Sequence, residues 1–131
     1  MLYYSDSEKR TREIAKEFAA TLKKGDVVLL SGELGAGKTA FMKGVAEYFG
    51  LSGVTSPTYA YLNVYGDLIY HYDCYRLSSG EEAATMGLTD YFGGDNICFI
   101  EWSENIEDAL PENRKRVRIE KRGENEREIE L

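Results

Sequence analysis

Residues 32 to 39 place glycines, a lysine and a threonine at a fixed spacing. They read Gly32-Glu33-Leu34-Gly35-Ala36-Gly37-Lys38-Thr39 and match G-x-x-x-x-G-K-[ST] at every position. The glycines let the backbone curl so that successive amides face an anion, and a helix that follows points its positive N-terminal end at the same anion. In such a loop the lysine reaches the β- and γ-phosphates and the threonine hydroxyl ligates Mg²⁺. The segment is predicted to bind phosphate, and a glycine-rich turn without a ligand is the alternative.

A loop of this kind needs a carboxylate to complete its Mg²⁺ site. In α/β folds that residue sits at the C-terminal end of a neighbouring buried strand. Glu101 follows four apolar residues and is the first candidate; the alternative is a solvated carboxylate at the end of a strand. Asp73 follows the strand-like residues 68–72 and is the second candidate; the alternative is an aspartate that caps a turn.

Other polar residues each allow a functional and a structural interpretation. A segment after the loop helix is a candidate switch that senses the γ-phosphate or Mg²⁺, with an ordinary proline turn as the alternative; its hydroxyls belong to Thr55, Ser56 and Thr58. His71, the single histidine, is more readily a packed or hydrogen-bonded strand residue than a catalyst. Arg76 either neutralises phosphate charge or pairs with an acid.

The elements that must position these residues follow from hydrophobic periodicity. Apolar residues at helical spacing predict a helix over 11–24, with Gly25 as its stop and three N-cap candidates, Ser5, Asp6 and Ser7. The apolar run 27–30 predicts a buried strand of a parallel sheet. A helix over 38–49, closed by Gly50, follows the loop.

The second half of the chain is richer in strand patterns. Residues 59–65 and 68–72 predict a hairpin turning at Gly66-Asp67, whose alternating Tyr59, Tyr61 and Tyr65 either pack or form a face for a partner. We expect short helices over 81–86 and 105–110, a buried strand over 97–100, and strands over 117–121 and 127–131. The succession of strand, helix and buried strand predicts an α/β fold. We expect one P-loop NTPase-like domain over residues 1–131. Its central sheet would be mixed and mainly parallel, flanked by helices, with a β-hairpin and C-terminal antiparallel strands.

Composition limits the partners. The 131 residues carry a formal net charge of −7, which disfavours binding nucleic acid through the whole surface. One basic cluster is either a solvated face paired with nearby glutamates or a docking surface for RNA or an acidic protein: Arg114, Lys115, Arg116, Arg118, Lys121 and Arg122. Cys74 and Cys98 lack metal-like spacing and are expected to be reduced core thiols, with a disulfide as the minor alternative. No leader or membrane-spanning run is seen, so a soluble, cytoplasmic protein without a metal cluster is expected.

Several strings occur together in a fixed order along residues 5–111. After the glycine loop come Ser56-Pro57-Thr58-Tyr59, His71-Tyr72-Asp73-Cys74-Tyr75-Arg76-Leu77, Met86-Gly87-Leu88, Asp90-Tyr91-Phe92 and Ile100-Glu101-Trp102-Ser103-Glu104. This set resembles the bacterial TsaE (YjeE) family. The loop is common to many proteins, whereas the H-x-D-x-Y-R-L string and the Glu-Trp pair discriminate. Glu33 and Ala40 depart mildly from the family, which usually has Asp and often Thr there.

The resemblance implies a small ATPase of tRNA threonylcarbamoyladenosine (t6A) synthesis that uses ATP and Mg²⁺. It implies TsaD and TsaB as protein partners, with tRNA reached through that complex. Lys38 and Thr39 would take the phosphates and Mg²⁺, with the rest of the loop through Ala40 around them. Glu101 and Asp73 would serve the metal or the attacking water. Three residues would border the nucleotide: Glu8 and Thr11 near the adenine, and Trp102.

Two other functions share the loop. A small-molecule P-loop kinase would need a substrate insert and a lid, for which the chain has little room. A GTPase-like switch would carry an N-K-x-D string, which is absent from the sequence. No arginine finger is identifiable, so we expect slow hydrolysis by the isolated chain and faster hydrolysis with partners.

Overall fold

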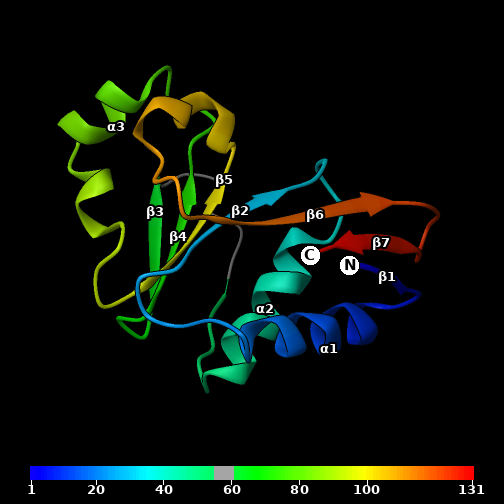
Figure 1. The fold of residues 1–131 in the computed structure, drawn as a ribbon. Coiled ribbons are helices and arrows are strands. Elements are labelled where there is room, and N and C mark those ends of the chain that lie inside the picture. The colour runs from blue at the N-terminus through cyan, green and yellow to red at the C-terminus, as the bar shows by residue number, and fades with distance from the viewer. Residues whose placement is uncertain (55–60) are drawn as a thin grey trace. The chain divides into compact units, whose positions relative to one another are not determined.

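The computed structural model describes residues 1–54 and 61–131 of the chain. Figure 1 shows the elements, which in chain order are β1 (Leu2–Ser5), α1 (Glu8–Ala19), β2 (Val27–Ser31), α2 (Lys38–Tyr48), β3 (Leu62–Tyr65), β4 (Ile69–Asp73), α3 (Gly80–Thr85), the 3-10 helix η1 (Leu88–Tyr91), β5 (Ile97–Glu101), the 3-10 helix η2 (Ser103–Ala109), β6 (Lys115–Lys121) and β7 (Arg127–Glu130). None of these helices has the length and apolarity needed to cross a membrane.

The contacts of the chain group it into two compact units. Of the described residues, the first unit takes in those of 1–22, 31–56 and 116–131, and the second takes in 23–30 and 57–115. The prediction of a single domain over residues 1–131 therefore stays a prediction. The predicted α/β class is confirmed, because parallel strands, antiparallel strands and helices are combined as expected.

The first unit contains three antiparallel strands. β7 pairs with β1 on one side and with β6 on the other, so that Ile129 lies opposite both Tyr3 and Ile119. The C-terminal strands were predicted; β1 was not, because only Ser5 to Ser7 were considered there, and only as helix caps. Ser7 is the cap: it is extended, and its hydroxyl accepts a hydrogen bond from the amide of Arg10.

Helix α1 begins earlier and ends earlier than the predicted helix over 11–24. The cap at Ser7 starts it at Glu8, and the chain leaves the helix after Ala19. The amides of Thr21 and Leu22 bond three residues back, to Phe18 and Ala19, which tightens the last turn. Leu22 continues the apolar periodicity but lies outside the helix, so the predicted stop at Gly25 is wrong.

Helices α1 and α2 lie against each other in the first unit (Figure 1). The approach is close at Gly44, where an added Cβ would come 2.5 Å from the carbonyl oxygen of Arg12. The rings of Phe18 and Phe41 are 5.9 Å apart, and Glu47 pairs with Lys16 at 3.0 Å. The helix that follows the glycine loop is thus fixed by a neighbouring helix.

The second unit is built on parallel strands. β5 pairs with β2 and with β4 in parallel, and β3 adds an antiparallel edge next to β4. Gly66 and Asp67, the predicted turn, both have positive φ, and the amide of Leu68 donates to the carbonyl oxygen of Tyr65, as in a type I′ turn. Parallel strands end at one edge, so the chain leaves β2, β4 and β5 at the same edge of this sheet.

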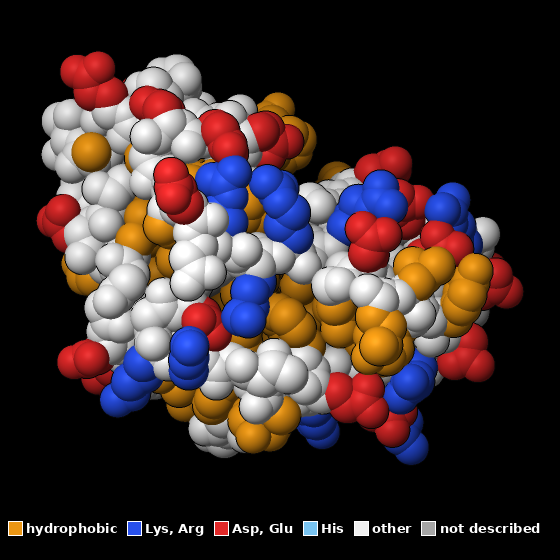
Figure 2. Space-filling model, in the orientation of Figure 1, with side chains coloured by type: hydrophobic (Ala, Val, Ile, Leu, Met, Phe, Trp, Pro, Cys, Tyr) orange, Lys and Arg blue, Asp and Glu red, His pale blue; other side chains and the backbone are white. Residues whose placement is uncertain are grey.

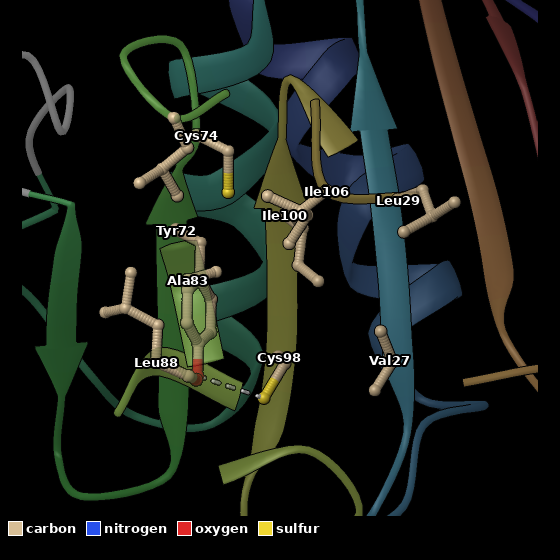
Figure 3. Packing of buried hydrophobic residues seen from close by; sticks show 10 residues of the cluster. Val27, Leu29, Tyr72, Cys74, Ala83, Leu88, Cys98, Ile100 and Ile106 are labelled. Atoms are coloured by element: carbon tan, nitrogen blue, oxygen red, sulfur yellow. Dashed lines mark hydrogen bonds between the residues drawn. The ribbon is translucent and has the colours of Figure 1, made fainter. Parts of the chain in front are cut away.

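One face of these strands is covered by α3, η1 and η2. Figure 3 shows the resulting cluster, to which the strands and short helices contribute Val27, Leu29, Tyr72, Cys74, Cys98, Ile100, Ala83, Leu88 and Ile106. Both cysteines are free and buried, as predicted, and burial raises the pKa of Cys74 to about 12 and that of Cys98 to about 11. The thiols are therefore protonated, inert parts of the core near neutral pH.

Candidate functional site

The glycine loop leaves β2 and enters α2 as the sequence predicted. Gly32 approaches the strand β6 so closely that a Cβ there would come 2.7 Å from the carbonyl oxygen of Ile119. Gly37, with φ of +108°, is the N-cap of α2 in the left-handed region that favours glycine. Glycine is needed at both positions, at the first for space and at the second for conformation.

The first turn of α2 has no side-chain cap. Gly37 has no side chain that could accept a hydrogen bond, and the first turn contains no acidic residue. The first amides of a helix have no partner within the helix and carry the positive end of its dipole. Lys38 and Thr39 stand in this turn and are half-buried, whereas Glu33 and Leu34 at the outer part of the loop are exposed. This arrangement suits an anion.

An arginine distant in sequence braces the loop. Arg127, in β7, donates from Nε to the carbonyl oxygen of Ala36 at 2.7 Å and from a terminal nitrogen to that of Gly35 at 3.3 Å. The sequence analysis missed this residue. The contact joins segments about ninety positions apart, and no motif in the sequence signals it.

The predicted carboxylate Glu101 is buried at the end of β5, with 9 % of its surface exposed. Its Oε2 lies 2.6 Å from Nε2 of His71, which is 1 % exposed. The alternative of a solvated strand-end carboxylate is therefore wrong. In the register of β4 and β5, His71 lies opposite Phe99, two residues before Glu101, so the two side chains are diagonal neighbours on one face of the sheet.

The hydrogen bond links the protonation states of the two groups. When Glu101 is ionised its carboxylate only accepts, and Nε2 of His71 is then the donor. The other ring nitrogen, Nδ1, is buried and has no hydrogen-bond partner among the described residues. His71 is thus a hydrogen-bonded strand residue, as the sequence analysis favoured, and its partner is the candidate carboxylate itself.

Asp73 lies directly opposite Glu101 in the register of β4 and β5. Its Oδ1 accepts a hydrogen bond from the amide of Tyr75 at 3.0 Å, which is the turn-capping arrangement the sequence offered as an alternative. Asn105, in η2, donates to the carbonyl oxygens of Cys74 and Tyr75 and fixes the same turn. Arg76 follows it, exposed, and belongs to none of the ion pairs among the described residues.

Trp102 follows Glu101 in a left-handed conformation with φ of 58° and ψ of 39°. That conformation is uncommon for a bulky residue and marks a place where the surroundings hold the backbone. The indole is 42 % exposed and meets the ring of Tyr75 edge-on, with 4.9 Å between ring centroids. The strand ends therefore carry an exposed aromatic pair beside two carboxylates.

The residues predicted near the adenine lie in α1. Glu8 is exposed and pairs with Arg12 at 3.6 Å, whereas Thr11 is buried with its hydroxyl 2.7 Å from that of Ser5. A role beside the nucleotide stays a prediction for both. Another set of residues, the switch-like Thr55, Ser56 and Thr58 and the hairpin's Tyr59, lies outside the described residues.

Half of the basic cluster is paired with acids, in agreement with the prediction of a solvated face with nearby glutamates for those three residues. Arg118 and Arg122 both bond Glu120, and Arg122 also bonds Glu128 at 2.6 Å. Figure 2 shows Lys and Arg side chains interleaved with acidic ones over β6 and β7. Arg114 pairs with Glu107.

Comparisons with known proteins define first a class and then a family. The chain is an α/β protein in which a glycine loop joins a buried strand to an uncapped helix. A structural relative is the crystal structure of YdiB from Bacillus subtilis. The TM-score is 0.80 at 39 % identity, over 98 % of this chain and 82 % of that one. The family model described as "Threonylcarbamoyl adenosine biosynthesis protein TsaE" matches residues 5–129. The chain belongs to the TsaE family.

Relatives with similar sequences are named as TsaE proteins. The protein named tRNA threonylcarbamoyladenosine biosynthesis protein TsaE from Bacillus subtilis is 45 % identical over 123 residues, 91 % of this chain and 77 % of its own length. The namesake from Haemophilus influenzae is 43 % identical over 118 residues, 83 % of this chain and 75 % of its own length. The resemblance found in the sequence motifs is thereby confirmed at the level of the family.

Proposed function

We propose that this chain binds and hydrolyses ATP with Mg²⁺ and serves t6A modification of tRNA together with TsaD and TsaB. The observation that carries the nucleotide part is the glycine loop, with its uncapped helix N-terminus at Gly37 and with Lys38 in the first turn. Membership of the TsaE family supports the pathway.

Binding would begin with the phosphates. Main-chain amides at the start of α2 donate to phosphate oxygens, and the ammonium group of Lys38 binds the β- and γ-phosphates. Gly37 is the uncapped N-cap of α2 and Lys38 stands in its first turn, which supports this proposal. The same donors stabilise the charge that develops on the γ-phosphoryl group during transfer.

The residues suit a magnesium ion that is shared with the nucleotide. Among the described residues, no three His, Cys, Asp or Glu side chains form a group that would hold a metal by themselves. Mg²⁺ is typically bound through one or two protein oxygens, phosphates and water. Thr39 is the candidate hydroxyl ligand, and Asp73 and Glu101 are the candidate carboxylates. When bound, the ion would neutralise phosphate charge.

Glu101 would orient the water that attacks the γ-phosphorus, with ADP as the leaving group. His71 supports this role, because its Nε2–H restricts the rotation of the carboxylate. Asp73 caps its turn by accepting a hydrogen bond from the amide of Tyr75, and it offers a second carboxylate at the same edge of the sheet. No arginine finger is identifiable in the sequence, so slow turnover by the isolated chain is expected.

Phosphate release tests the proposal. Hydrolysis of Mg·ATP is measured for the isolated chain and for the chain with TsaD and TsaB, and t6A is measured in tRNA incubated with the complex. We expect slow release alone, faster release with the partners, and t6A formation that depends on the chain. Rapid and equal rates in both mixtures, or t6A formation without the chain, contradict the proposal.

A further inference from the structure

The guanidinium group of Arg127 bonds only to main-chain carbonyl oxygens among its described hydrogen bonds. Nε and one terminal nitrogen bond Ala36 and Gly35 in the loop, at 2.7 and 3.3 Å. The other terminal nitrogen bonds three carbonyl oxygens of the β6–β7 turn, at 3.0 to 3.3 Å, from Gly123, Glu124 and Glu126. One side chain thus ties the glycine loop to the turn of the C-terminal hairpin.

The charge of Arg127 is not used in an ion pair. None of the ion pairs among the described residues includes it, although its hairpin neighbours Arg118 and Arg122 are both paired with glutamates. The side chain is half-buried, and its Nε would lie 3.6 Å from a Cβ added to Gly37. A positive charge therefore stands directly behind the loop, and no carboxylate of the described residues forms an ion pair with it.

The hydrogen bonds to the loop set the direction of its peptide groups. A trans peptide is planar, and its N–H points opposite to its C=O. The carbonyl group of Ala36 points at Arg127, so the N–H of Gly37 in the same peptide points away from Arg127. The amide of Ala36 closes the loop internally by bonding Glu33 at 2.9 Å. Arg127 thereby fixes the peptide between Ala36 and Gly37, which comes just before the first peptide of α2.

We propose that Arg127 is a positioning residue of the phosphate loop. Its guanidinium holds the carbonyls of Gly35 and Ala36 on one side, which keeps the Gly37 amide aimed at the opposite side, where the phosphates of a nucleotide bind. The role rests on the proposed nucleotide binding by this loop. It does not require Arg127 to touch the nucleotide, and Lys cannot replace it fully because an ammonium lacks the planar fork.

The test compares Arg127→Gln and Arg127→Lys with a matched control on the same hairpin, Arg122→Gln, whose side chain bonds glutamates and not the loop. The dissociation constant of Mg·ADP is measured by calorimetry, and thermal unfolding reports folding. Residues that orient binding groups without contacting the ligand typically contribute about 10-fold to 100-fold to affinity. We expect a loss of this size in Arg127→Gln, a smaller loss in Arg127→Lys and no change in Arg122→Gln.

A second measurement, without nucleotide, separates this proposal from the proposed function. Amide hydrogen exchange of the native protein and of Arg127→Lys is followed at residues 35–38 and in β6 and β7. Faster exchange confined to the loop supports the positioning role even if the native chain binds no nucleotide. Unchanged loop exchange, native affinity in Arg127→Lys or Arg127→Gln, or an equal loss of affinity in Arg122→Gln overturns it.

Discussion

The substitution Glu101→Gln separates a chemical role of this residue from a structural one. The amide keeps the shape of the side chain and an oxygen that accepts the hydrogen bond from His71, now 2.6 Å long. A hydrogen bond to a charged group contributes about 1.5–3 kcal/mol and a neutral one about 0.5–1.5 kcal/mol, so the bond weakens by about 1 kcal/mol. The neutral amide is also easier to bury at this site, which offsets part of that loss.

The net effect on stability is therefore at most about 1 kcal/mol, or about 3–6 °C in the unfolding midpoint for a chain of this size. A carboxylate that orients the attacking water typically contributes about 100-fold to 10,000-fold to the rate. We expect Glu101→Gln to bind Mg·ATP within a few-fold of the native protein and to lose at least about 100-fold in turnover. Thermal unfolding, calorimetric titration and phosphate release with TsaD and TsaB check the three quantities. Turnover within twofold of the native rate would refute the role of Glu101.

Three further predictions concern other parts of the molecule. Gly44→Ala should lower the free energy of unfolding by about 1–3 kcal/mol, because its Cβ would come 2.5 Å from the carbonyl of Arg12; chemical denaturation checks this, and native stability would contradict the close helix approach. Burial raises the pKa of the Cys74 and Cys98 thiols, so with rising pH the unfolded chain loses these protons before the folded protein does. The free energy of unfolding should therefore fall as the pH rises from about 9 through the pKa values of the folded protein. Thermal unfolding between pH 8 and 10.5 should show this decline, flattened in Cys98→Ala; an equal slope in both proteins would count against it. Trp102 is the single tryptophan, so its fluorescence should change on addition of Mg·ATP if it borders the nucleotide, and a constant spectrum at saturation would remove it from the site.

The sequence predicted best what depends on neighbours in the chain. The glycine loop, the Gly66-Asp67 turn and the buried run 97–100 are local patterns, and the structure has each where it was expected. The cap at Ser7 was among three candidates for the same reason. Where local signals competed, as at Leu22, tight turns ended the helix before the apolar periodicity did.

The contacts that the sequence did not reveal join distant segments. The pairing of His71 with Glu101 depends on the register of two strands that α3 and η1 separate in the chain, and a shift by one residue would place the side chains on opposite faces. Arg127 reaches the loop only because β6 and β7 form a hairpin whose turn presents it there. Register and long-range packing are set by the whole fold, so neither contact has a motif.

Calorimetric titration of Mg·ATP into the native protein and into Lys38→Ala tests the central claim most directly. Removing a charge-assisted contact to phosphate should cost about 1.5–3 kcal/mol, or about 10-fold to 150-fold in affinity, with an unfolding midpoint close to that of the native protein. We expect saturable binding of one nucleotide by the native chain and a loss of this size in the variant. Equal affinity in the two folded proteins would contradict the assignment of this loop to the phosphates.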